Sequence, residues 1–134
     1  MRFEEVEHTA DRALRIRGRD LADLFANAAA GLNSLMLASD SSDAASVAKR
    51  IELEAADAED LLVAWLSELA FWAETESLIF SRFHFMELTP VRLRAVITGG
   101  HVEALQKHVK AVTFHNLAIR HEPEGLVVTV VFDV

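Results

Sequence analysis

The sequence contains no cysteine, and none of its apolar runs approaches the roughly 20 residues that a membrane-spanning helix needs. The absence of cysteine excludes a disulfide framework, a thiolate metal site and a cysteine nucleophile. The chain starts with the acidic segment MRFEEVE, which includes no hydrophobic signal segment. We therefore expect a cytoplasmic protein that is mature as written and makes no contact with a membrane.

Basic residues are the minority among the charges. Thirteen Lys and Arg stand against 21 Asp and Glu, for a formal net charge of −8 at pH 7. Nucleic-acid-binding proteins usually carry a basic patch that displaces counterions from phosphates. Here the basic residues are scattered, and the alternate arginines from Arg15 to Arg19 indicate the solvent-exposed face of a strand and its turn. We expect no direct grip on nucleic acid, because an acidic surface suits cations or basic protein partners better.

Several motifs of enzymes and metal sites are also missing. The five glycines form no phosphate-binding loop, which argues against a nucleotide-binding fold. No GxSxG motif is present to support a Ser-His-Asp hydrolase. None of the six histidines has the HxxxH or finger-type spacing of a zinc site. Of these, His8 and His115 lie beside the candidate site segments described below.

The composition that remains is that of an ordinary globular protein, with 51% hydrophobic and 25% charged residues. A length of 134 residues predicts one domain, residues 1–134, that is large enough for a hydrophobic core. Two stretches have helical periodicity, residues 21–36 and residues 61–73, with Asp20 and Asp57 as N-caps. Both apolar stripes are expected to face the core.

Elsewhere the pattern alternates with the period of two that is typical of strands. The segments concerned are residues 14–17, 50–54, 78–88, 92–97, 112–119 and 126–132. Gly99-Gly100 is expected to end the strand before it, and the segment EPEG at residues 122–125 predicts the turn of a C-terminal hairpin. Residues 38–46 are expected to form a surface loop. The order of elements predicts an α+β, two-layer domain in which two main helices pack on a largely antiparallel sheet.

The last predicted strand ends in a carboxylate. Asp133 follows Val127, Thr129 and Val131 on one face of that strand, and a carboxylate there is costly to bury unless it reaches water, a donor or a cation. The main-chain carboxylate of Val134 would add a second negative group. The alternative is that the last two residues fray into solvent.

Asp11 lies ahead of the strand at residues 14–17. It can simply form an Asx turn or cap a local N–H. If the first and last strands are neighbours, however, Asp11, Asp133 and Val134 would meet in one place and would suit a hard cation, because Ca²⁺ and Mg²⁺ prefer oxygen ligands. No EF-hand spacing is present, so such a site would be assembled from distant segments.

Lys110 is the remaining singular cation, at the entrance to the segment at residues 112–119. As an edge charge it would discourage further strand pairing. As a functional group it would contact a carboxylate near the metal or on a partner.

Four segments, in order along the chain, resemble those of the archease family. They are HTAD at residues 8–11, DLLVAWLSEL at residues 60–69, VKAVTFH at residues 109–115 and VFDV at residues 131–134. Each alone is weak, but together they are specific and span essentially the whole chain.

The resemblance implies an α+β fold built around a strand-helix-strand-strand module. It also implies a non-catalytic role, because archeases are accessory proteins of the GTP-dependent RNA ligase that joins 3′-phosphate and 5′-hydroxyl ends, notably in tRNA splicing and RNA repair. They promote guanylylation of the ligase and its multiple turnover. By the same resemblance Asp11, Asp133 and Val134 would be metal ligands, with Ca²⁺ preferred and Mg²⁺ or Mn²⁺ as alternatives. Lys110 would be needed to activate the ligase, whereas Glu68 lies in a matching segment without an assigned role.

The match has two departures. Phe114 stands where the family usually has tyrosine, which removes a hydroxyl group, and residues 99–108 are only loosely similar. Two other functions stay open at this point. One is a small metal-dependent phosphoester hydrolase with His115 as acid or base, and the other is a general chaperone or adaptor in which the metal only joins the two ends of the sheet.

Overall fold

The computed structural model describes residues 2–6, 12–37, 47–113 and 117–134. In these residues the chain forms two helices and eight strands. The helices are α1 (Leu21–Met36) and α2 (Ala58–Glu76), and the strands are β1 (Phe3–Val6), β2 (Arg12–Gly18), β3 (Val47–Glu54), β4 (Leu78–Thr89), β5 (Arg92–His101), β6 (Ala111–Thr113), β7 (Arg120–Glu122) and β8 (Gly125–Asp133).

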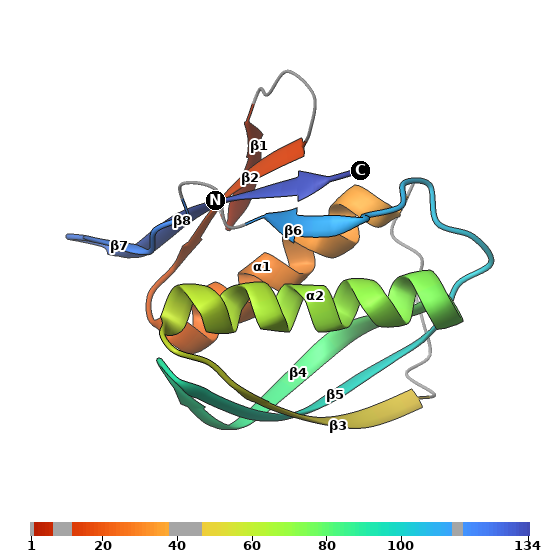
Figure 1. Cartoon of the computed structure of the whole chain (residues 1–134), viewed down its shortest axis with the longest axis horizontal. Helices are drawn as coiled ribbons and strands as arrows, with labels where there is room; N and C mark the ends of the chain where they lie inside the picture. Colours follow the sequence, from red (N-terminus) through yellow and green to blue (C-terminus); the bar gives the residue numbers. More distant parts are fainter. Residues whose placement is uncertain (1, 7–11, 38–46, 114–116) are drawn as a thin grey trace.

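The two helices lie between two antiparallel sheets (Figure 1). Within the described part of the chain, the first sheet has five strands in the order β1-β2-β8-β6, and its fifth strand, β7, also pairs with β8. The second sheet has three strands in the order β3-β5-β4. The α+β class is thereby confirmed. The succession β3-α2-β4-β5 is the strand-helix-strand-strand module that the family resemblance implies.

The arrangement differs from the expected two layers, because the strands form two sheets, one on each side of the helices. The physical reason lies in how much of each helix is apolar. On α2 the consecutive residues Leu61, Leu62 and Val63 are all buried. Consecutive helical positions are about 100° apart, so these three span about 200° of the helix surface. One sheet covers only one side of a helix, and here both helices contact strands of both sheets.

The core is continuous across the three layers. Its largest fully buried side chains include Trp65 and Phe25 from the helices, Phe132 from the first sheet, and Leu93 and Ile97 from the second. The apolar side chains of this core are removed from water between the layers, and such burial is the main favourable term in folding.

Gly99-Gly100 lies inside β5, so the prediction that it ends the strand is wrong. The backbone of β4 approaches Gly99 so closely that a Cβ atom at this position would lie 2.0 Å from the carbonyl oxygen of Ile79. Glycine is needed here for close approach between two backbones rather than for a turn.

Residues 112–119 do not form one strand, contrary to the prediction. Strand β6 covers only Ala111–Thr113, residues 117–119 have no regular structure, and β7 begins at Arg120. The C-terminal hairpin is confirmed, since Glu122 of β7 pairs with Gly125 of β8 across the turn. Gly125 has a φ of 139°, a conformation that favours glycine.

Both predicted N-caps are confirmed. The side chain of Asp20 accepts a hydrogen bond from the backbone N–H of Asp23 at 2.9 Å, and that of Asp57 accepts one from Asp60 at 2.8 Å. The expected surface loop at residues 38–46 lies outside the described residues. No helix in the described part of the chain is long and apolar enough to cross a membrane.

Replacing Asp57 with alanine is expected to lower the free energy of unfolding by about 1 kcal/mol, because the N–H of Asp60 loses its acceptor. Asp57→Ser keeps a capping oxygen and should remain close to the parent protein. Urea unfolding monitored by circular dichroism measures both changes. Equal losses in the two variants would contradict a capping role.

Candidate metal centre

Asp133 and Val134 lie at the end of β8, on the edge of the molecule where the chain terminates (Figure 1). The side chains of Val128, Val130 and Phe132 on this strand are buried toward the helices. Asp133 follows them in the alternation, on the opposite face, and is exposed. Val134 is partly buried and packs against the core. The carboxylate of Asp133 therefore remains in water while its neighbours hold the strand end in place.

Lys110 lies directly beside this strand end. Its backbone N–H donates a hydrogen bond to the backbone carbonyl of Asp133 at 2.7 Å, and the next residue, Ala111, pairs with Asp133 in the β6–β8 ladder. The side chain of Lys110 is exposed. The structure thus brings together two residues that the sequence had identified separately.

Strand β6 is also the edge strand of the first sheet. A lysine at its entrance fits the edge-charge interpretation as well as the functional one, because a charge there discourages pairing with another chain. The position of Lys110 is fixed by its neighbours: Val109 and Val112 are both buried in the core.

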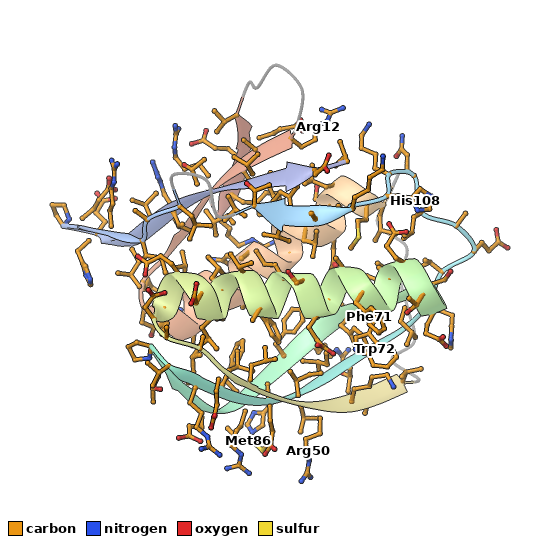
Figure 2. The ribbon with its side chains drawn as sticks, viewed as in Figure 1. Arg12, Arg50, Phe71, Trp72, Met86 and His108 are labelled. Carbon is orange, nitrogen blue, oxygen red and sulfur yellow. The ribbon has the colours of Figure 1, made fainter. Side chains whose placement is uncertain are left out.

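The start of β2 lies on the other side of β8. Arg12 pairs with Phe132, which is the last β2–β8 pair in the described residues. Arg12 is labelled in Figure 2. Its guanidinium forms an ion pair with Glu5 of β1. The starts of β2 and β6 therefore flank the end of β8, and we call this region the strand-end corner: Arg12, Lys110, Ala111, Asp133 and Val134.

Asp11, the chain neighbour of Arg12, lies outside the described residues, as do His8 and His115. Among the residues that the structure does describe, no group of three or more His, Asp or Glu is placed to hold a metal ion. The described part of the strand-end corner contributes one side-chain carboxylate, that of Asp133, and it forms no ion pair with another described residue.

Sequence reasoning missed the role of Glu5 at this corner. Its pairing with Arg12 neutralises the cation at the start of β2, opposite Phe132. Only the pairing of β1 with β2 shows this, because the two residues are seven positions apart in the sequence.

The sequence model of the archease protein family matches residues 3–134. The chain belongs to the archease family. It is 34% identical over 142 residues to the protein archease of Methanopyrus kandleri, with 99% of each chain covered. It is 35% identical over 133 residues to that of Methanothermobacter thermautotrophicus, covering 93% of this chain and 92% of the relative.

Solved structures agree with this assignment. The solution structure of protein 1598 from Methanobacterium thermoautotrophicum is similar with a TM-score of 0.80 and 29% identity, and 99% of each chain is covered. A crystal structure from Thermotoga maritima, described as an archease and possible chaperone, has a TM-score of 0.70 at 20% identity, covering 98% of this chain and 96% of that one. The second likeness shows a shared fold.

The segment ahead of Lys110, which was only loosely similar to other archeases, is anchored at three points. The N–H of Val102 donates to the carbonyl of Ser77 at 2.9 Å, and that of Gln106 donates to Met36 at 2.8 Å. Nδ1 of His108, a residue labelled in Figure 2, lies on the surface near α2. Its distance to a carboxylate oxygen of Glu74 on that helix is 2.9 Å. These contacts tie the segment to both helices and so position Lys110.

Glu68, in the archease-like segment of α2, has a contact that explains its presence. Its carboxylate accepts a hydrogen bond from Nε1 of Trp72 at 2.9 Å. The ammonium of Lys49 lies 4.0 Å from the centre of the Trp72 ring, in cation–π geometry. Glu68 therefore orients Trp72 on the helix surface.

Proposed function

We propose that this protein is a metal-binding accessory factor of a GTP-dependent RNA ligase that joins 3′-phosphate and 5′-hydroxyl ends in tRNA splicing and RNA repair. In this role it promotes guanylylation of the ligase and its multiple turnover, and it is not itself the enzyme. The observation that carries the proposal is the pairing of Lys110 with Asp133 at the strand-end corner, joined by an N–H···O hydrogen bond of 2.7 Å.

The corner has donor chemistry that fits a hard cation. Asp133 offers an exposed carboxylate, and Val134 and the backbone supply further oxygen atoms. Asp11 directly precedes Arg12 in the chain, and the partner of Arg12, Phe132, directly precedes Asp133. Two carboxylates with additional carbonyl or carboxyl oxygens favour Ca²⁺, with Mg²⁺ or Mn²⁺ as alternatives. We propose Asp11, Asp133 and Val134 as the ligands.

The exposure of the corner supports action on another protein. Asp133, at the end of β8, and Lys110, just ahead of the edge strand β6, are both exposed, so that a partner can reach them. An exposed cation site with few protein ligands leaves coordination positions for groups of the partner. The net charge of −8 also favours a basic protein surface as the partner of this region. Lys110 would contact a carboxylate of the ligase beside the metal.

The test is a multiple-turnover ligation assay with purified ligase, GTP and RNA that carries 3′-phosphate and 5′-hydroxyl ends. The parent protein is expected to raise ligase turnover, whereas Asp11→Asn, Asp133→Asn and Lys110→Met should lose most of that stimulation. Calorimetric titration with Ca²⁺ should show at least about tenfold weaker binding to the two aspartate variants, because charge count sets the affinity of such sites. Lys110→Met should still bind Ca²⁺.

Controls separate this role from others. Glu103→Gln removes an exposed carboxylate from a loop and should leave stimulation intact, and Lys110→Arg keeps the positive charge. If Asp11→Asn, Asp133→Asn and Lys110→Met all stimulate the ligase as fully as the parent protein, the assignment of these residues to the site is contradicted. Turnover of phosphoesters without a ligase would indicate a hydrolase. If chelation lowered the protein's stability while the site variants still stimulated the ligase, a chaperone or adaptor with a structural metal would be the better description.

A further inference from the structure

The face of the first sheet that points away from the helices contains a hollow of about 220 Å³ beside β7. Three arginines line it, Arg15, Arg17 and Arg120, together with the carboxylate-bearing Glu122 and the hydroxyl-bearing Thr129. The lining thus has three positive formal charges and one negative one, in a chain whose net charge is −8.

The strand registers place Arg17 and Arg120 in one row. Both residues pair with Val127 of β8, Arg17 from β2 on one side and Arg120 from β7 on the other. Directly paired residues of antiparallel strands carry their side chains on the same face. The two backbones are two strand spacings apart, about 10 Å, so the long side chains can reach one ligand from opposite sides. Arg15 lies two residues before Arg17 on β2, on the same face, and pairs with Thr129.

Arg17 and Arg120 are exposed and form no ion pair with another described residue. Arg15, in contrast, forms an ion pair with Glu4, in which its guanidinium nitrogen lies 3.0 Å from a carboxylate oxygen. Elsewhere in the described residues, Arg92 and Arg94 on the second sheet are each paired with glutamates. The hollow therefore holds two guanidinium groups whose donors remain available to a ligand.

We infer that this hollow is a binding site for a phosphate group, held between the guanidinium groups of Arg17 and Arg120. A guanidinium donates two parallel hydrogen bonds to a phosphate or a carboxylate. A carboxylate presents its two oxygens to a fork in one plane, whereas a phosphate carries oxygens on several sides and can accept a fork from each of two arginines that face each other. Two available arginines on opposite sides of one hollow therefore favour phosphate.

The dimensions of the hollow limit the part of a ligand that it can enclose. Its volume is below the range of about 300–1,000 Å³ for pockets that enclose a drug-sized ligand, so it is too small to enclose a nucleotide. Its lining contains no aromatic side chain on which a base could stack. The site would contact the phosphate and leave the remainder of a nucleotide or RNA strand outside.

The site is separate from the strand-end corner. Val127 and Asp133 lie near opposite ends of β8, about 20 Å apart at the rise of a β-strand. In Figure 1, β7 lies at the opposite end of β8 from the C-terminus. The inference does not depend on the proposed metal or on the ligase.

The experiment compares the parent protein with Arg17→Gln/Arg120→Gln in two arms, and a polyglutamate peptide is titrated as a competing ligand in each. In one arm, inorganic phosphate is titrated while the Nε–Hε resonances of the arginines are followed by NMR. In the other, a short fluorescein-labelled oligouridylate is titrated and its anisotropy is measured at two salt concentrations. The matched control is Arg50→Gln/Arg82→Gln, which removes two exposed arginines of the second sheet that also form no ion pair with described residues.

We expect phosphate to shift the Arg17 and Arg120 resonances, and the Arg17→Gln/Arg120→Gln variant to bind phosphate or RNA at least about tenfold more weakly than the parent. The control should bind as the parent does. If only inorganic phosphate binds, the natural ligand is a small phosphate-bearing molecule. If the RNA binds more tightly than phosphate, and its binding weakens with salt, the natural ligand is a nucleic acid. Both results support the site. Equal weakening in the control would overturn it, as would absence of binding. A polyglutamate peptide that bound more tightly than both probes would overturn the assignment to phosphate in favour of an acidic protein.

Discussion

Replacing Trp65 with alanine is expected to lower the free energy of unfolding by about 3–5 kcal/mol. Trp65 is fully buried on α2, where it lies between the layers. Its ring centre is 5.4 Å from that of Phe85, 5.6 Å from Phe83 and 6.5 Å from Phe25. The substitution would leave a large cavity bordered by α1 and β4, and rigid rings on several sides limit how far the cavity can collapse.

A hydrogen bond adds to this cost. Nε1 of Trp65 donates to the backbone carbonyl of Phe25 at 3.0 Å, inside the core. Trp65→Phe retains most of the packing but removes this donor, so it should cost less than Trp65→Ala, with about 1 kcal/mol from the lost hydrogen bond. Trp72→Ala, at the partly exposed tryptophan of the same helix, is the matched control. Urea unfolding followed by circular dichroism measures all three, and a loss in Trp72→Ala as large as in Trp65→Ala would contradict the central role of Trp65.

Replacing Gly99 with valine is expected to lower the free energy of unfolding by at least about 3 kcal/mol, at the upper end of the usual cost of overpacking. A Cβ atom there would lie 2.0 Å from the carbonyl oxygen of Ile79 and 2.6 Å from the Cα of Phe80. Both are backbone atoms of β4, so no side chain can rotate to relieve the clash. Strand β4 would have to move away from β5, which disrupts the second sheet.

Thr98→Val is the control for this prediction. Thr98 precedes Gly99 on the opposite face of β5 and is only partly buried, so a β-branched residue of similar size should be tolerated within about 0.5 kcal/mol. Thermal and urea unfolding of the two variants decide the comparison. A Gly99→Val protein as stable as Thr98→Val would contradict the close approach of the β4 and β5 backbones.

The helices could be predicted from the sequence because their signals are local. Periodic apolar residues and the caps at Asp20 and Asp57 all lie within one element, and the structure shows helices that begin directly after these caps. The C-terminal hairpin was predictable for the same reason, since its turn is encoded between Glu122 and Gly125.

The failures concern contacts between distant segments. Gly99 was interpreted as the end of a strand, yet its role is to admit the backbone of β4. The number of sheets was also misjudged. An apolar pattern shows which surface of a helix must be buried, but it does not show what packs against that surface. The same pattern is compatible with one sheet and neighbouring loops or with two sheets.

Of the candidate site, sequence reasoning and the family resemblance supplied the residues but not their arrangement. Asp133 and Lys110 were selected for different reasons, and the antiparallel pairing of β6 with β8 brings them into contact. Asp11 remains a proposed ligand, because it lies outside the described residues.

By itself the sequence determined the helices, the α+β class and the membership of the archease family, because local periodicity, capping and ordered motifs are all readable along the chain. Only the tertiary structure decided which charges are neighbours. Arg17 and Arg120 appear in the sequence as two scattered cations, and their pairing with the same residue of β8 sets them at one hollow. Strand register is set by hydrogen bonds between segments that are distant in the sequence. That register places the two arginines at the candidate phosphate site, and the sequence alone does not show it.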